Sequence, residues 1–325
     1  MKLDLLKRED LPADIITVSP SQLSAWYRCQ YLWKLMKIDN VGDEDYNVYG
    51  AANRGQVLHA FCKWLYDHSI GRAVGTLSEV GKMKLIEDIQ RVHQTDGNFW
   101  QVYAIFQAYV EWAAKKDELV AHGAEVETFA PTGLTSRDGR LIYFHGFIDL
   151  IASLFDKLLV VDHKSHTNRP WTRERLFYDH QLIFYWLLLE LQGVQVDGAM
   201  VNAVNLFIPK NSGDFHPERT VQMKASNVPG RKTKTLVPRF ERFTIGPNDV
   251  KLQFYLDEFL TNIKQMWCGE PVYPMRLSSD CQFCSFKAHI ELDAKGMHEG
   301  ALANLRTRHN TGDFDLVDDL EDAEL

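Results

Sequence analysis

Two acids and a lysine stand in or just after two apolar stretches of this chain. Asp149 lies in the mostly apolar residues 143–152, and Asp162 and Lys164 come just after the apolar residues 158–161. A continuously apolar run such as 158–161 predicts a strand that is buried on both faces. Because Asp162 and Lys164 are separated by one residue, their side chains should point to the same face of an extended strand.

These residue types suit the metal-dependent hydrolysis of a phosphodiester. Buried charges need partners, and a divalent metal and a phosphate would supply them. Carboxylates are hard oxygen ligands for Mg²⁺ or Mn²⁺. A nearby lysine can orient or deprotonate the attacking water and stabilise the charged phosphate. The alternative interpretation is an ordinary Asp–Lys ion pair at a strand end.

Two apolar helices are expected to carry further polar residues. Residues 175–193 are rich in Leu and close with Gly193, which predicts one buried helix. Gln181 and Tyr185 would share one face of it, either as satisfied core residues or as supports of a nucleic-acid backbone. Residues 55–65 also have a helical pattern, with His59 among apolar neighbours. A histidine in such a setting is by itself more often a core residue than a ligand.

In this order the motifs resemble the RecB-type branch of the PD-(D/E)XK nuclease superfamily. That branch includes the nuclease domains of recombination helicase–nucleases and the CRISPR adaptation exonucleases. Its pattern is a His on an early helix, Gly-x-x-Asp, Asp-x-Lys and Gln-x-x-x-Tyr. In this chain the pattern falls on His59, Gly146 with Asp149, Asp162 with Lys164, and Gln181 with Tyr185. The resemblance spans residues 19–287.

The resemblance implies a role for each of these residues. His59, Asp149 and Asp162 would bind Mg²⁺ or Mn²⁺, with the backbone carbonyl of His163 as an extra ligand. Lys164 would serve the attacking water, and the catalytic set would be completed by Gln181 and Tyr185, which would support the DNA and the site.

The superfamily often has a Glu before the Gly-x-x-Asp strand. Glu125 and Glu127 are both candidates, and alternation puts them on the same face of a strand. The sequence leaves the choice between them open, and a solvated strand face accounts for at least one.

Cysteines near both ends of the resemblance resemble the ligands of its iron–sulfur members. Those members supply one Cys near the N-terminus and three near the C-terminus. Cys29, Cys281 and Cys284 match, but Ile290 stands at the fourth position and His289 is one place early. A [4Fe-4S] cluster with His289 as fourth ligand, a zinc site with the same residues, and no metal all remain open. Two other residues, Cys62 and Cys268, are expected to be core thiols.

The charge of the chain is compatible with a DNA partner despite its net value of −8. Seven acids fall in residues 313–325, which leaves 37 acids and 36 bases elsewhere. A near-neutral body can carry a basic groove.

Two segments are candidates for that groove. Residues 229–234, followed by Arg239 and Arg242, predict a basic loop or hairpin. Residues 168–175 join the Asp-x-Lys strand to the next helix, so their arginines could hold phosphates while Trp171 stacks on a base. The expected DNA contacts are Arg169, Trp171, Arg173, Arg175, Arg231, Lys232 and Lys234. The alternative is two solvated surface loops, with Trp171 folded onto the core.

The expected fold class is α/β, a mixed central sheet flanked by helices. It would be a restriction-endonuclease-like core with a helical N-terminal part. Three regions are expected: a helical region at 1–120, the nuclease core with the C-terminal cysteines at 121–292, and an acidic, disordered tail at 293–325 that could bind a partner protein. A strand is also expected near residues 199–208.

The composition predicts a cytoplasmic enzyme with no membrane contact. Hydrophobic residues make up 45% of the chain, which excludes wholesale disorder. Five cysteines and no secretory signal argue against a disulfide framework, and no apolar run reaches the length of a membrane span.

Two functions remain. The first is a divalent-metal-dependent DNA nuclease, foremost an exonuclease acting on DNA ends in recombination, repair or replication. The second is a non-catalytic DNA-binding or assembly factor that keeps the nuclease fold.

Overall fold

The computed structural model describes residues 3–39, 51–71, 99–116, 119–167, 171–208, 215–218, 221–224, 234–270 and 273. The chain divides into two compact units. The first comprises residues 1–20, 48–226 and 230–270, and the second comprises residues 21–47, 227–229 and 271–325. The predicted division at residues 120 and 292 stays a prediction, and the acidic tail at 293–325 lies outside the described residues.

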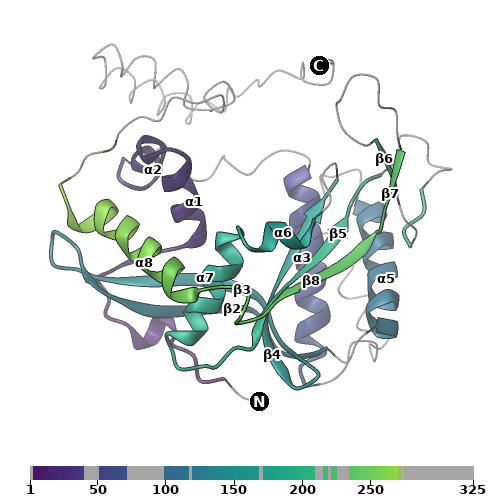
Figure 1. Ribbon diagram of the computed structural model, residues 1–325, viewed down its shortest axis with the longest axis horizontal. Helices are drawn as coiled ribbons and strands as arrows, with labels where there is room; N and C mark the ends of the chain where they lie inside the picture. The colour runs from purple at the N-terminus through teal and green to yellow at the C-terminus, as the bar shows by residue number, and fades with distance from the viewer. Residues whose placement is uncertain are drawn as a thin grey trace, which may run out of the picture. The chain divides into compact units, whose positions relative to one another are not determined.

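The first unit is built on a mixed six-stranded sheet (Figure 1). The strand order is β1-β3-β4-β5-β8, and β2 pairs with β3 beside this path. The β1–β3 and β4–β5 pairs are parallel, whereas β2–β3, β3–β4 and β5–β8 are antiparallel. The strands are β1 (Ile15–Val18), β2 (Val120–Thr135), β3 (Leu141–Leu154), β4 (Lys157–His166), β5 (Gly198–Asn205) and β8 (Phe240–Ile245).

The sheet forks where β3 and β4 stop pairing. Their ladder runs from the Leu154–Lys157 pair to the Leu150–Val161 pair. Because β2 occupies the other edge of β3 along its whole length, β1 takes the same edge as β4, from Leu141 to Phe144. Residues 145–149 of β3 therefore lie between these two neighbours. The sheet's polar motifs fall at this fork.

Helices cover both faces of the sheet (Figure 1). On one side, α3 (Ala51–Asp67) and α5 (Phe99–Lys116) form a core with Leu150, Val161 and Met200. On the other, α7 (His180–Glu190) packs on β3, β4 and β5 and against α8 (Leu252–Ile263). A π-helical turn, η3 (Lys264–Cys268), continues α8.

The prediction of a single helix over residues 175–193 is wrong. The segment is split into α6 (Arg173–Leu176) and α7 by a break at residues 177–179. The break arises because Asp179 caps α7: its Oδ1 accepts a hydrogen bond of 3.0 Å from the backbone N–H of Leu182. The predicted strand at 199–208 likewise ends earlier, at Asn205, whose Oδ1 accepts from the N–H of Phe207.

The remaining elements are short. η1 (Arg8–Asp10) precedes the sheet, and β6 (Val221–Lys224) pairs antiparallel with β7 (Lys234–Val237). Within the described ranges, no helix is both long and apolar enough to cross a membrane.

The second unit contains most of α1 (Pro20–Arg28) and all of α2 (Gln30–Lys37). Trp26 and Trp33 pack edge to face with ring centroids 5.2 Å apart, and the Tyr273 ring lies 6.4 Å and 5.9 Å from them. Tyr273 therefore brings the chain shortly before Cys281 onto the same two helices.

Candidate active site

Two carboxylates lie directly at the fork of the sheet. Asp149 and Asp162 each come one residue beyond the last paired residues, Leu150 and Val161. Asp149 is 7% exposed and Asp162 is fully buried. The backbone N–H of His163 donates a 2.8 Å hydrogen bond to Oδ2 of Asp149. A main-chain donor that no longer faces a strand therefore positions the acid.

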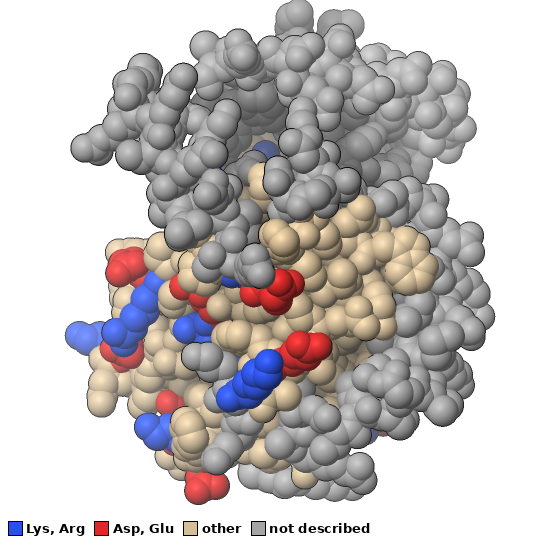
Figure 2. All heavy atoms as spheres, turned by 90° about the vertical axis from the view of Figure 1, so that its right-hand side faces the viewer, with Lys and Arg blue, Asp and Glu red and all other residues tan. Residues whose placement is uncertain are grey.

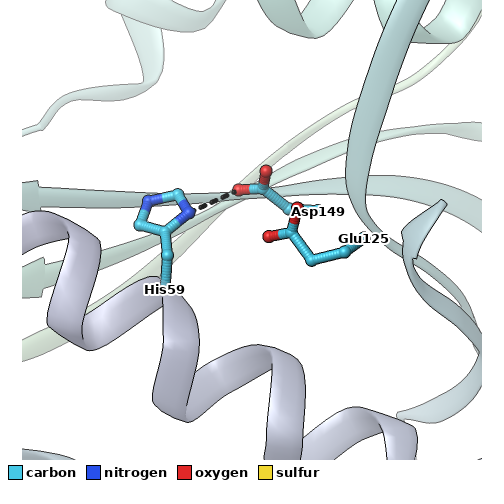
Figure 3. Close-up of side chains that lie close together, drawn as sticks. All are labelled: His59, Glu125 and Asp149. Carbon is cyan, nitrogen blue, oxygen red and sulfur yellow. Dashed lines mark ion pairs between the residues drawn. The ribbon is translucent and has the colours of Figure 1, made fainter. Parts of the chain in front are cut away.

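His59 and Glu125 join Asp149 from two other elements (Figure 3). His59 projects from α3, and its Nδ1 lies 3.4 Å from Oδ2 of Asp149. One ligand atom from each of the three residues lies within 4.8 Å of the other two. One imidazole nitrogen and two carboxylates form a donor set that suits Mn²⁺ and accommodates Mg²⁺.

The structure distinguishes the two glutamates that the sequence left open. Glu125 faces His59 and Asp149, whereas Glu127 pairs with His145 at 3.0 Å and is partly exposed. Glu125 also has a positive φ of 48°, which is uncommon for a residue other than glycine and costs about 1–3 kcal/mol. The alternation of side chains along a regular strand does not predict this local departure from an extended backbone.

Asp162 is buried without hydrogen-bond partners. The ammonium of Lys164 lies 2.7 Å from its Oδ2 as an ion pair, so the predicted shared face is confirmed. This approach is not aligned as a hydrogen bond, and neither oxygen accepts one from the described residues. Lys164 supplies one cation, but a buried carboxylate whose two oxygens accept no hydrogen bond from the described residues can still hold a second cation. The residues present at the fork therefore fit a divalent metal.

A chain of polar contacts links Lys164 to α7. Its Nζ donates to Oε1 of Gln181 at 2.7 Å, and Nε2 of Gln181 donates to Oη of Tyr185 at 3.0 Å. The predicted common face of Gln181 and Tyr185 is therefore confirmed. Gly146 makes room for this helix, because a Cβ there would lie 2.8 Å from Cε1 of Tyr185 and 2.9 Å from Cδ1 of Leu188.

A sequence model of one family decides the classification. The model described as the PD-(D/E)XK nuclease superfamily matches residues 17–289, well over half of the chain. The chain belongs to the PD-(D/E)XK nuclease superfamily. Membership implies a phosphodiester hydrolase that uses a divalent metal, and the mixed sheet flanked by helices confirms the predicted restriction-endonuclease-like α/β fold. No curated protein matches the chain.

Burial sets the electrostatics of this PD-(D/E)XK site. It raises the pKa of Asp149 well above the usual value, and the charge of Asp162 adds to the effect. Burial also raises the pKa of Glu125 and lowers the pKa of His59. When several carboxylates are buried close together, a cation placed between them stabilises their charged forms.

Lys164 keeps its charge despite being enclosed. Burial alone would lower its pKa, but Asp162 and Asp179 outweigh burial, so the pKa is raised. As an ammonium, Lys164 is suited to orienting water and stabilising phosphate charge rather than to accepting a proton.

The predicted DNA contacts are described only in part. Arg173 and Arg175 are exposed on α6, with the Arg175 guanidinium 4.2 Å from the ring centroid of Trp171 and Arg173 paired with Asp249 at 3.4 Å. Outside the described residues lie Arg169, Arg231 and Lys232, the last two in the connection between β6 and β7, and the side chain of Lys234 is likewise not described.

The expectation that Arg239 lines a basic groove is wrong. It is 4% exposed, and its guanidinium donates to the carbonyls of Asn205, Phe207 and His216, where it ties β8 to the end of β5. On the face shown in Figure 2, the described Lys and Arg side chains are interspersed with Asp and Glu. The described part of that face therefore carries no continuous basic stripe.

The cysteines fall into two groups. Cys62 is fully buried on α3, which confirms it as a core thiol, whereas Cys268 is only half-buried, so that prediction is wrong. Cys29 is partly exposed between α1 and α2. The other proposed cluster ligands, Cys281, Cys284 and His289, lie outside the described residues.

Proposed function

We propose that this protein is a DNA nuclease of the RecB-type branch, foremost an exonuclease that acts on DNA ends in recombination, repair or replication. The observation that carries the proposal is the cluster of His59, Glu125 and Asp149 beside the Asp162–Lys164 pair. Superfamily membership supports hydrolysis of a phosphodiester.

The metal ligands in this proposal are His59, Glu125, Asp149 and Asp162, with the carbonyl of His163. A bound Mg²⁺ or Mn²⁺ would activate water and neutralise charge on the phosphate. The protein's own residues supply the rest. Lys164 orients the water and stabilises the phosphate, Gln181 holds Lys164 through its 2.7 Å hydrogen bond, and Tyr185 holds Gln181.

DNA would enter over α6, because this helix joins β4 to α7 and both carry site residues. Arg173 and Arg175 would contact phosphates, and Trp171 would present its ring to a base. The proposal extends to Arg169, Arg231, Lys232 and Lys234 as further phosphate contacts. A cytoplasmic location, and a protein partner for the acidic tail at 293–325, belong to the same proposal.

We also propose a second metal centre, a [4Fe-4S] cluster or Zn²⁺, held by Cys29, Cys281, Cys284 and His289. The packing of Tyr273 on Trp26 and Trp33 supports it, because this one residue, eight positions before Cys281, lies on the two helices that flank Cys29.

The test is cleavage of single- and double-stranded DNA labelled at either end, with Mg²⁺, Mn²⁺ or EDTA. We expect metal-dependent loss of label from linear DNA and no cleavage of closed circles. Asp149→Ala and Asp162→Ala should abolish cleavage while the control Asp257→Ala, which changes an exposed residue of α8, should retain it. Cleaved circles would make the protein an endonuclease. DNA binding without any cleavage would favour a non-catalytic DNA-binding or assembly factor.

A further inference from the structure

A network of buried polar side chains lies directly behind the fork. Asn202 of β5 donates from Nδ2 to Oη of Tyr109 at 2.9 Å and contacts Nδ1 of His163 at 3.2 Å. Arg242 of β8 donates from Nε to Oδ1 of Asn202 and from Nη2 to Oη of Tyr109 at 3.3 Å. The hydroxyls of Tyr109 and Tyr66 lie 2.6 Å apart.

Donor and acceptor chemistry fixes the direction of each contact. A guanidinium can only donate, so the atom of Asn202 that faces Arg242 must be its oxygen. Its amide nitrogen then faces His163, and Nδ1 of His163 must accept. The imidazole therefore carries its proton on Nε2. Tyr109 accepts from both Asn202 and Arg242, so its own proton points to Tyr66.

His163 is held on a second side as well. The Tyr66 ring is stacked on the imidazole with centroids 5.4 Å apart and planes 13° apart. His163 is 2% exposed. Its main-chain N–H is the group that holds Asp149.

We propose that Asn202, Arg242, Tyr109 and Tyr66 are positioning residues of the metal site. They fix the His163 side chain, and through it the peptide that orients Asp149. Hydrogen bonds in a buried network restrict the groups they join, and here they hold the Nδ1 edge of the imidazole, whereas Nε2 of His163 finds no acceptor among the described residues. Supporting contacts of this kind typically change metal affinity by about 10–100-fold when removed. This proposal depends on the proposed function only where it concerns DNA cleavage.

Asn202→Asp is the sharpest variant, because it keeps the shape and the Arg242 contact but replaces the donor that faces His163 with an acceptor. Two-bond ¹H–¹⁵N NMR should show the Nε2–H tautomer of His163 in the wild type and the Nδ1–H tautomer in Asn202→Asp, with the signals assigned through His163→Gln. Titration with Mn²⁺, followed by the EPR signal of the free ion, should show about 10-fold weaker binding in Asn202→Asp and in Tyr109→Phe.

Arg239→Lys is the matched control, since Arg239 is a buried arginine whose hydrogen bonds go to three carbonyls away from the fork. It should lower the melting temperature and leave Mn²⁺ affinity and the KM for DNA unchanged. The KM should also be unchanged in Asn202→Asp. Wild-type Mn²⁺ affinity in both network variants, or an Nδ1–H tautomer in the wild type, would overturn the proposal. A wild type that cleaves no DNA would sink the proposed function instead, and the tautomer measurement would still test the positioning role.

Discussion

The backbone N–H of His163 donates a 2.8 Å hydrogen bond to Oδ2 of Asp149, across the point where β3 and β4 separate. A carboxylate thus takes the place of a strand as the partner of this N–H. The same separation leaves Asp162 buried and without a hydrogen bond from the described residues. Both acids stand one residue beyond the last pair of the β3–β4 ladder, so the fork places them at the same point of the sheet.

Lys164 is expected to act on the reaction rather than on DNA affinity. Lys164→Met removes the ammonium that pairs with Asp162 and donates to Gln181. We expect turnover at saturating DNA to fall by about 10²–10⁴-fold with the dissociation constant for DNA little changed. Lys115→Met, which changes an exposed lysine of α5, is the control and should cleave normally. Weaker binding combined with a wild-type rate would assign Lys164 to DNA binding instead.

Gly146 is expected to tolerate no side chain. Its substitution by Ala would place a Cβ 2.8 Å from Tyr185 and 2.9 Å from Leu188, so α7 would have to shift. We expect a loss of about 1–3 kcal/mol in the free energy of unfolding, with reduced cleavage because Gln181 moves with the helix. Gly269→Ala is the matched control, since its Cβ would meet nothing closer than 3.6 Å. Denaturant unfolding of both variants measures the difference, and equal stabilities would contradict this account of Gly-x-x-Asp.

The sequence predicts a feature correctly where the repeat of a single strand or helix decides it. The apolar run at 158–161 predicted β4, and the spacing of Asp162 and Lys164 predicted their common face, because strand geometry alone decides both. The same holds for Gln181 and Tyr185 on α7, since the helical repeat alone places them together.

Other features depend on tertiary context and could not be predicted from the sequence. The choice of Glu125 over Glu127 depends on one residue with a positive φ. The burial of Arg239 depends on three carbonyls that converge only in the fold. The network behind His163 joins residues from α3, α5, β4, β5 and β8, and no local motif signals it.

His166 is expected to make the protein less stable in acid. Burial, together with Arg175 and Arg239, lowers its pKa to about 4 from the usual 6.5. Between these values the unfolded state binds more protons than the folded state, so the contribution of His166 is fully present above pH 6.5 and is lost as the pH falls through the folded value. Denaturant unfolding at pH 7.5 and 4.5 should show a smaller loss of stability in His166→Gln than in the wild type. His68→Gln, which removes an exposed imidazole, should behave as the wild type. An equal loss in all three proteins would assign the acid sensitivity to other groups.

Cys29 is expected to hold a metal together with the C-terminal cysteines. Tyr273 already ties the chain shortly before Cys281 to Trp26 and Trp33, on either side of Cys29. A metal there would close a very long loop, and binding of this kind contributes directly to folding free energy. Anaerobically purified protein should contain iron with visible absorbance, or zinc by elemental analysis. Cys29→Ser should lose the metal and melt at a lower temperature, whereas Cys268→Ser, a half-buried thiol outside the proposed set, should keep it. Metal-free wild-type protein, with an unchanged melting curve in Cys29→Ser, would mean that Ile290 marks a site that has decayed.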